Sequence, residues 1–358
     1  MTKTTKKHLI TLPRREFLMR GGAGILGTIV AAGTANIVGA QAVTAENVRS
    51  NLSALRMGDF NPSYASQWAY RLAQALGYLE EVGIDELEVI LTEEYVAGLV
   101  GGSLDIVHGD TSALVSAAVA SGLPIKMVSI HRDSEWWIMG VRAGIETVED
   151  LRGGTITGGP LGGRNTWVMK QVLTRLGLNP ETDVTFVPTS GGSDARIGAL
   201  INSTVDAASV FPRHEAPLAE SGGKFLFREI VSAPQEAFGV MGGDWLVENE
   251  AAVQAWVLAD VKARMFLHDP ANREQAYQIM IDYGYEITEN QKSLYEVEIQ
   301  QLSRDGGFES AELMDSFMLE LVETGDVPAG IDWRDYWDLR YLWAAQDALG
   351  LPRRPASV

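Results

Sequence analysis

Short apolar segments alternate with helix-forming segments along the first two thirds of the chain, and this alternation constrains the fold more than any other feature. The apolar segments predict strands, and Gly, Pro, Ser and Asn separate them from the helix-forming stretches. Strands that alternate with helices are typical of parallel sheets with helices on both faces, so we expect an α/β fold. The predicted strands cover residues 54–58, 88–91, 105–108, 125–130, 155–157, 184–187 and 207–211.

The same alternation occurs twice and then gives way to a mostly helical region after Gly239. Two α/β units followed by helices suit two lobes whose chain crosses from the first lobe to the second and returns. Strand-like segments at 135–142 and 231–239 are the predicted crossovers. Helices are predicted at 64–76, 96–100, 110–121, 167–176, 194–201, 248–267, 273–283, 290–301, 311–323 and 333–349.

The first 42 residues have the order of an export signal. Arg14 and Arg15 precede an apolar stretch rich in Gly and Ala, and the small-x-small step at 40–42 follows it. The arginine pair followed by x-Phe-Leu resembles a twin-arginine (Tat) signal, which implies the Tat machinery as a partner. A membrane anchor is the alternative, but the Gly and Thr content and the cleavage step favour removal near Ala42. We therefore expect a soluble periplasmic protein.

Composition excludes several kinds of site. The chain has no cysteine, which rules out disulfides, thiol nucleophiles and a lipid-anchoring cysteine. It has 29 Lys and Arg against 47 Asp and Glu, for a formal net charge of −18, which opposes binding to nucleic acid. The histidines show no metal-ligand spacing, and the chain has no G-x-S-x-G elbow, so we expect no metal, no cofactor and no catalytic residues.

Four short motifs in a fixed order carry a family resemblance. Together they resemble the nitrate/sulfonate/taurine and thiamine-pyrimidine (NMT1/THI5-like) group of ABC-importer substrate-binding proteins. The motifs are Ala73-Gln74-Ala75-Leu76-Gly77-Tyr78-Leu79-Glu80-Glu81-Val82-Gly83-Ile84, Gly102-Ser103-Leu104-Asp105-Ile106, Gly144-Ile145-Glu146-Thr147-Val148-Glu149-Asp150-Leu151-Arg152-Gly153 and Val205-Asp206-Ala207. Ser203 and Thr204 replace the usual glycine region before the last motif.

The resemblance implies a type II periplasmic-binding-protein fold with two α/β lobes, two crossovers and a helical C-terminal region. It places the first lobe at 55–135 plus 239–349 and the second lobe at 141–230, after the signal peptide expected at 1–42. It also implies a monomeric binding protein without enzymatic activity, which closes over a small ligand and delivers it to an ABC permease with its cytoplasmic ATPase.

The ligand site of an open α/β sheet lies beyond the carboxyl ends of its strands, and four strand-to-helix loops lead there. Their free N–H groups favour an anionic ligand group, although each loop can also simply cap its own helix. The Gly158–Thr166 loop lacks the Lys and Ser/Thr of a P-loop, so we expect a polar-group clamp and not a nucleotide site. The loop candidates are Phe60, Asn61, Tyr64, Asp110, Thr111, Ser112, Gly162, Arg164, Asn165, Thr166 and Ser193.

Aromatic and basic residues complete the predicted site. Trp136 and Trp137 lie at the first crossover, where neighbouring side chains of a strand face opposite ways, so one of the two is expected in the cleft. Phe211 and Arg213 follow the last predicted strand. Arg213 suits a carboxylate or sulfonate, or alternatively pairs with Glu215 or Glu220. Asp110 suits a ligand amine, or alternatively caps the helix after it.

These features favour an organic sulfonate or carboxylate, with an aromatic body as one option. A neutral pyrimidine-like heterocycle is the alternative ligand, and nitrate ranks third because it would leave the aromatic residues unused. A pyrimidine-synthesis-type enzyme on the same fold is the alternative activity. Its cysteine-rich motif is absent from this chain. Presentation of the ligand to a sensory receptor is a third reading that the sequence does not separate from import.

Overall fold

The computed structural model describes residues 47–59 and 68–358, all of which belong to one structural unit. The predicted signal peptide and the site candidates Phe60, Asn61 and Tyr64 lie outside the described residues. The strands are β1 (Ala54–Asp59), β2 (Glu86–Leu91), β3 (Ile106–Asp110), β4 (Ile125–Val141), β5 (Thr155–Gly159), β6 (Thr185–Pro188), β7 (Ala207–Ser209) and β8 (Lys224–Met241).

Helices follow most of these strands, as the alternation predicted. The helices are α1 (Ala69–Ala75), α2 (Tyr78–Glu81), α3 (Tyr95–Val100), α4 (Thr111–Ser121), α5 (Arg164–Arg175), α6 (Gly192–Ile201), α7 (Glu215–Glu220), α8 (Asp244–Glu248), α9 (Glu250–His268), α10 (Arg273–Asp282), α11 (Glu289–Ile299), α12 (Ala311–Thr324) and α13 (Arg340–Ala348). Short 3₁₀ turns include η3 (Pro212–His214) and η5 (Trp333–Asp335). Within the described residues, no helix has the length and apolarity that a bilayer-spanning segment needs.

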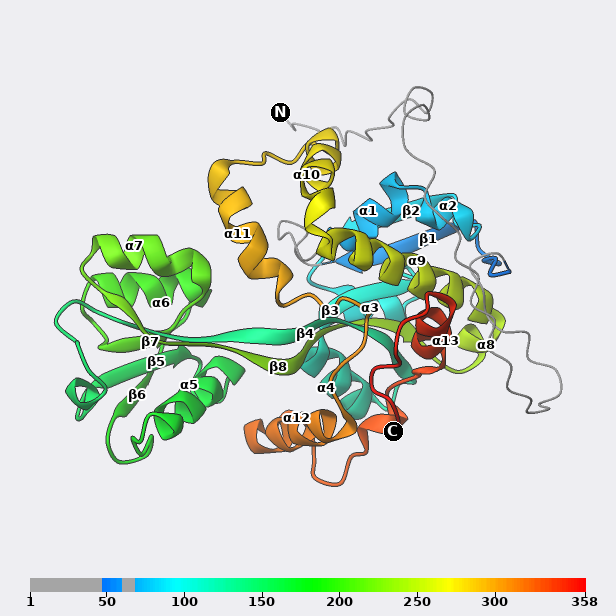
Figure 1. Cartoon of the computed structure of the whole chain (residues 1–358). Coiled ribbons are helices and arrows are strands. Elements are labelled where there is room, and N and C mark those ends of the chain that lie inside the picture. Colours follow the sequence, from blue (N-terminus) through cyan, green and yellow to red (C-terminus); the bar gives the residue numbers. More distant parts are fainter. Residues whose placement is uncertain (1–46, 60–67) are drawn as a thin grey trace, which may run out of the picture. The chain divides into compact units, whose positions relative to one another are not determined.

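The eight strands form one sheet in the order β2-β1-β3-β8-β4-β7-β5-β6 (Figure 1). The outer pairs β1–β2, β1–β3, β5–β6 and β5–β7 are parallel, whereas β8 and β4 run antiparallel to their neighbours. The predicted crossovers lie mostly within β4 and β8, which pair with each other from Ile125↔Met241 to Val141↔Lys224. Register shifts between Ile130 and Ser134 interrupt this ladder near its middle. The two predicted crossovers therefore belong to one antiparallel pair of long strands, β4 and β8, which we call the ribbon.

Separate hydrophobic cores lie at the two ends of this ribbon. The larger core joins β1–β3 to α1, α9, α12 and α13, and we call this part the first lobe. Two smaller cores join β5 and β7 to α5–α7, and we call this part the second lobe. The domain boundaries given by the resemblance remain predictions, but these cores show which elements pack together.

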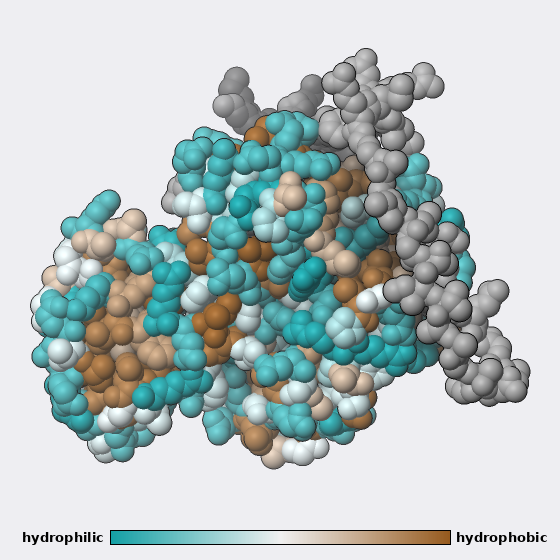
Figure 2. Space-filling view, viewed as in Figure 1, coloured by the Kyte–Doolittle hydropathy of each residue, from teal (hydrophilic) through white to brown (hydrophobic). Residues whose placement is uncertain are grey.

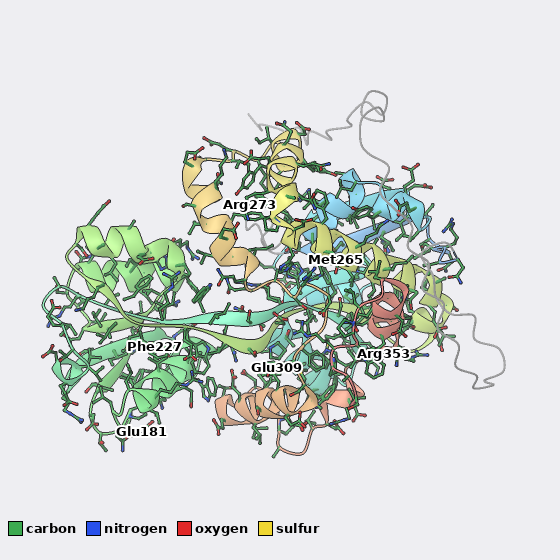
Figure 3. The ribbon with its side chains drawn as sticks, in the orientation of Figure 1. Glu181, Phe227, Met265, Arg273, Glu309 and Arg353 are labelled. Carbon is green, nitrogen blue, oxygen red and sulfur yellow. The ribbon has the colours of Figure 1, made fainter. Side chains whose placement is uncertain are left out.

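The two lobes differ at the strand that ends their half of the sheet, which is β4 in the first lobe and β8 in the second. In the first lobe, C-terminal residues bond to β4: Met127 N donates to Tyr336 O at 2.8 Å, and Ile130 N donates to Gly306 O at 2.7 Å. In the second lobe, residues 224–232 of β8 pair only with β4 among the described strands. Brown apolar surface is visible over this lobe in Figure 2, where Figure 3 labels the half-buried Phe227 of β8.

One helix prediction was wrong in its extent. The segment 333–349 was predicted as a continuous helix, but it consists of η5, an extended step and α13. Trp337 forms a parallel bridge with Met127, and Asp338 N donates to Met127 O at 2.9 Å. The Asp338 N–H thus bonds to β4 and is not available for a hydrogen bond within a helix. Trp333, Trp337 and Tyr341 are nevertheless all buried in the larger hydrophobic core.

Candidate functional site

The carboxyl ends of β3, β5 and β7 position the candidate residues, as the fold class predicts. At the end of β3, Asp110 caps α4: its Oδ1 accepts from Ser112 N at 2.9 Å and from Ala113 N at 3.3 Å. The capping interpretation of Asp110 is therefore confirmed. Burial raises the pKa of Asp110, although Ser112 and Arg164 act in the opposite direction. The neighbouring Thr111 is fully buried, and its Oγ1 has no hydrogen-bond partner among the described residues.

A buried network of charged side chains lies beside this loop. His108 on β3 contacts Asp59 through Nδ1 and Glu236 through Nε2, each at 3.1 Å. Arg132 donates to the other Glu236 oxygen at 3.1 Å, and the Tyr70 hydroxyl donates to Asp59. The network joins β1, β3, β8 and β4 where the ribbon ladder is irregular.

The charges in this network stabilise one another. Burial alone would lower the pKa of His108, but the attraction and hydrogen bonds of Asp59 and Glu236 outweigh it and raise the pKa to about 9. Burial would raise the pKa of Glu236, but Arg132 and His108 outweigh it and lower the pKa. His108 therefore carries a proton at neutral pH and balances the two carboxylates.

The structure also brings together three groups that could hold a metal ion. Ligand atoms of His108, His131 and Glu236 lie within 4.8 Å of one another, a set that sequence spacing did not predict. Both Glu236 oxygens accept from cationic partners, and the His131 Nδ1 lies 2.7 Å from an Arg264 nitrogen that can only donate to it. A neutral His131 that accepts there carries its proton on Nε2, which opposes coordination. The bonding pattern is that of a charge network.

The second lobe contributes a buried arginine that sequence reasoning missed. Arg196 of α6 is only 4% exposed, and its Nε donates to Ser209 O at the end of β7 at 2.7 Å. Burial lowers its pKa, and the nearby Arg213 lowers it further. Among the described residues no carboxylate forms an ion pair with Arg196, so its charge is not compensated there. A lone arginine in a helix gives no signal of this in the sequence.

Arg213 lies near Arg196, because both guanidinium groups lie over the Phe211 ring, and we call these two arginines the cationic corner. The Arg213 guanidinium donates to Ser193 Oγ at 2.8 Å and stacks on the Phe211 ring at 4.9 Å. Glu215, one of its predicted alternative partners, instead accepts from Arg228 at 3.1 Å. The structure thus brings Ser193, Phe211 and Arg213 together.

Burial, together with the nearby Arg213, lowers the pKa of the adjacent His214 to about 4. The His214 Nδ1 accepts from Phe211 N at 3.1 Å. His214 is therefore neutral above pH 6 and adds no charge to the two arginines.

The glycine-rich loop before α5 closes tightly on itself. A Cβ at Gly158 would lie 2.3 Å from Thr166 N, so the loop requires glycine there, whereas Gly162 has open space around it. Thr166 Oγ1 donates to Pro160 O at 2.8 Å, and Asn165 Oδ1 accepts weakly from Ser209 Oγ at 3.5 Å. Asn165 and Arg196 therefore both contact Ser209.

Arg164 neither faces solvent freely nor lies in the cationic corner. It donates to Glu135 of β4 at 2.6 Å and pairs with Glu320 of α12.

The two tryptophans of the first crossover face opposite sides of the sheet, as predicted. Trp136 donates from Nε1 to Val297 O of α11 at 3.2 Å and lies under the Arg228 guanidinium at 4.8 Å. Trp137 is buried in the core beside α5, and its Nε1 donates to Glu135 Oε1 at 2.6 Å. Trp136 is therefore the more accessible of the two.

Solved structures with this fold include several binding proteins. The periplasmic sulfonate-binding protein SsuA from Methylobacillus flagellatus KT is 16% identical, with a TM-score of 0.64 over 84% of this chain and 96% of its own. The periplasmic nitrate-binding protein NrtA from Synechocystis PCC 6803 is 16% identical, with a TM-score of 0.62 over 86% and 93%. DszB in complex with biphenyl-2-sulfinic acid is 14% identical, with a TM-score of 0.57 over 82% and 99%. No curated protein matches the chain in sequence.

These likenesses establish the fold, and a sequence-family match establishes the family. The family model described as NMT1/THI5 like matches residues 67–254, just over half of the 358-residue chain. The matched region contains all four motifs whole, most of the lobe elements and the cationic corner. The chain therefore belongs to the NMT1/THI5-like family and has the periplasmic-binding-protein fold.

Proposed function

We propose that this protein is the solute-binding component of an ABC importer and that it captures a small organic anion between its lobes. One observation carries the anionic assignment: Arg196 is almost fully buried, yet no described carboxylate neutralises it. A buried charge without a partner is costly, and an anionic ligand group would remove that cost. Arg213 and the Ser193 hydroxyl supply further donors for the same group.

The ligand body is proposed to lie against the aromatic side chains near this corner, with a sulfonate or carboxylate as its head group. Phe211 and Trp136 offer ring faces there, and both are half-buried. The sulfonate- and nitrate-binding proteins of similar fold support an anionic ligand as a class. A pyrimidine-like heterocycle is the second candidate, and it would leave Arg196 uncompensated.

The remaining parts of the proposal concern location and partners. An export signal at residues 1–42 would place the mature protein in the periplasm as a monomer, where a permease with its ATPase would receive the ligand. A binding role without covalent chemistry is favoured by the lack of any cysteine. DszB, which shares this fold, was solved in complex with biphenyl-2-sulfinic acid.

Native mass spectrometry of the purified protein, followed by a thermal-shift panel, tests the proposal. The probes are an alkanesulfonate, benzenesulfonate, benzoate, nitrate and an aminopyrimidine. Arg196→Gln removes the buried charge, and Arg175→Gln is the matched control because Arg175 lies on the same lobe with its side chain 44% exposed.

A sulfonate or carboxylate should stabilise the wild type and the control. Its affinity for Arg196→Gln should fall by about 1.5–3 kcal/mol, the value of a charge-assisted hydrogen bond. An aminopyrimidine as the sole ligand, or equal anion affinity in Arg196→Gln, would overturn the proposal.

A further inference from the structure

The geometry points to a closing bridge between the lobes, formed by Arg164 and Trp167 of α5 with Glu320 and Glu323 of α12. We propose that this bridge holds the second lobe against α12 and so favours the closed arrangement of the proposed binding cleft. The inference rests on the proposed two-lobe capture, but it assigns to Arg164 a positioning function and no contact with the ligand.

Arg164 joins three elements of the chain. Its NH2 donates to Glu135 Oε1 on β4 at 2.6 Å, and its NH1 pairs with Glu320 on α12. Both carboxylates are only 7% exposed. Such largely buried ion pairs are screened much less by salt than surface pairs, and they are costly to break one partner at a time.

Trp167 forms a second contact between the same two helices, an exposed hydrogen bond three residues further along α5. Its indole Nε1 donates to Glu323 Oε2 at 3.0 Å. Residues three apart lie on the same face of a helix, so the pair Arg164/Trp167 on α5 faces the pair Glu320/Glu323 on α12. The Arg164 guanidinium also lies 5.9 Å from the Trp167 ring, which holds the two donors together.

The acceptors are fixed to the first lobe. Phe317 and Leu321 of α12 are buried in the first-lobe core, on either side of Glu320 in sequence. Val168 and Met169, just after Trp167, are buried in a second-lobe core. The bridge therefore joins two helices that are each packed into the core of their own lobe. Separation of the lobes would break both contacts.

Measuring the distance between the lobes tests the bridge directly. Because the chain has no native cysteine, spin labels would attach only to the cysteines that are introduced. Ala219→Cys on α7 and Gln275→Cys on α10 are exposed positions for spin labels, one on each lobe. Pulsed electron resonance then gives the distribution of interlobe distances in the mature protein without added ligand. The test pair is Glu320→Gln with Glu323→Gln, which keeps side-chain size and removes both charges.

The matched control is Glu309→Gln with Glu274→Gln, which changes the net charge equally at exposed positions. Glu309 precedes α12 in the chain and is labelled in Figure 3.

We expect the test pair to shift the population toward longer distances by about tenfold or more, the factor for one lost charge-assisted hydrogen bond. Trp167→Phe should give a smaller shift, and the control should give none. Circular dichroism should remain unchanged throughout.

Identical distance distributions in the wild type and the test pair would overturn the bridge. Since this measurement uses no ligand, its failure would leave the anion proposal standing. Loss of anion binding in Arg196→Gln, in turn, would not depend on the bridge.

Discussion

The stability of this protein should fall as the pH rises above neutrality, because the buried His108 then loses its stabilising proton. The folded-state pKa is about 9, against an ordinary value of 6.5, because Asp59 and Glu236 outweigh the effect of burial. The folded protein therefore binds this proton more tightly than the unfolded chain. Its stabilising effect is complete below pH 6.5 and is lost as the pH rises through 9.

The magnitude follows from the size of the shift. A rise from 6.5 to about 9, at about 1.36 kcal/mol per pKa unit, corresponds to about 3 kcal/mol of unfolding free energy. No discount for solvent screening applies, because the His108 side chain is fully buried. The buried tyrosines titrate in a separate range: their pKa values are raised above 10 by burial, so their effect begins only at higher pH.

Urea unfolding followed by tryptophan fluorescence, at several values between pH 6 and pH 9.5, measures this effect. The unfolding free energy of the wild type should fall by about 3 kcal/mol across that range. His108→Gln should be less stable at pH 6 and should lack the slope.

His268→Gln is the control. Burial lowers the pKa of His268 to about 4, so His268 influences stability only on the acid side. A flat wild-type profile from pH 6 to pH 9.5 would refute the reasoning, even if His108→Gln failed to fold.

Three further predictions address other residues. Arg213→Ala should weaken binding of the anionic probe by about 1.5–3 kcal/mol in calorimetric titration, and Arg213→Lys should restore only part of it because Lys lacks the planar two-point contact; unchanged affinity would remove Arg213 from the site. Thr111→Val should raise the unfolding free energy by about 1 kcal/mol, since the fully buried Thr111 Oγ1 lacks a partner among the described residues; a loss in urea unfolding would contradict this. Arg14→Lys with Arg15→Lys should leave the precursor in the cytoplasm on cell fractionation, and normal export would exclude a twin-arginine signal.

The sequence could predict what depends on local pattern. Alternation of strands and helices identified the fold class, and the extended character of both crossovers was visible in their residues. Capping of α4 was one of two interpretations of Asp110 from its place before the helix, and Asp110 does cap α4. The opposite orientation of Trp136 and Trp137 follows from the two-residue period of a strand and is also confirmed.

Contacts between distant segments could not be predicted in this way. His108 meets Glu236 across 128 residues, and Trp167 meets Glu323 across 156 residues. Arg196 resembles an ordinary helix-surface arginine until β7 and the glycine-rich loop bury it. The break after η5 arises because β4 presents an open edge to the C-terminal residues. Each of these features is a property of the assembled sheet and not of any window of sequence.

The pairing of Val141 with Lys224 has a consequence for how binding specificity can change. The chain leaves the β4–β8 ribbon and re-enters it at the same place, so residues 142–223 form an insertion whose two ends are already neighbours. Both arginines of the cationic corner, and the loops around them, belong to this insertion. A homologous insertion with matched ends could replace it without cutting any strand of the first lobe. The residues proposed to hold the anionic group of the ligand could therefore be exchanged together, while the lobe that carries α9, α12 and α13 stays the same.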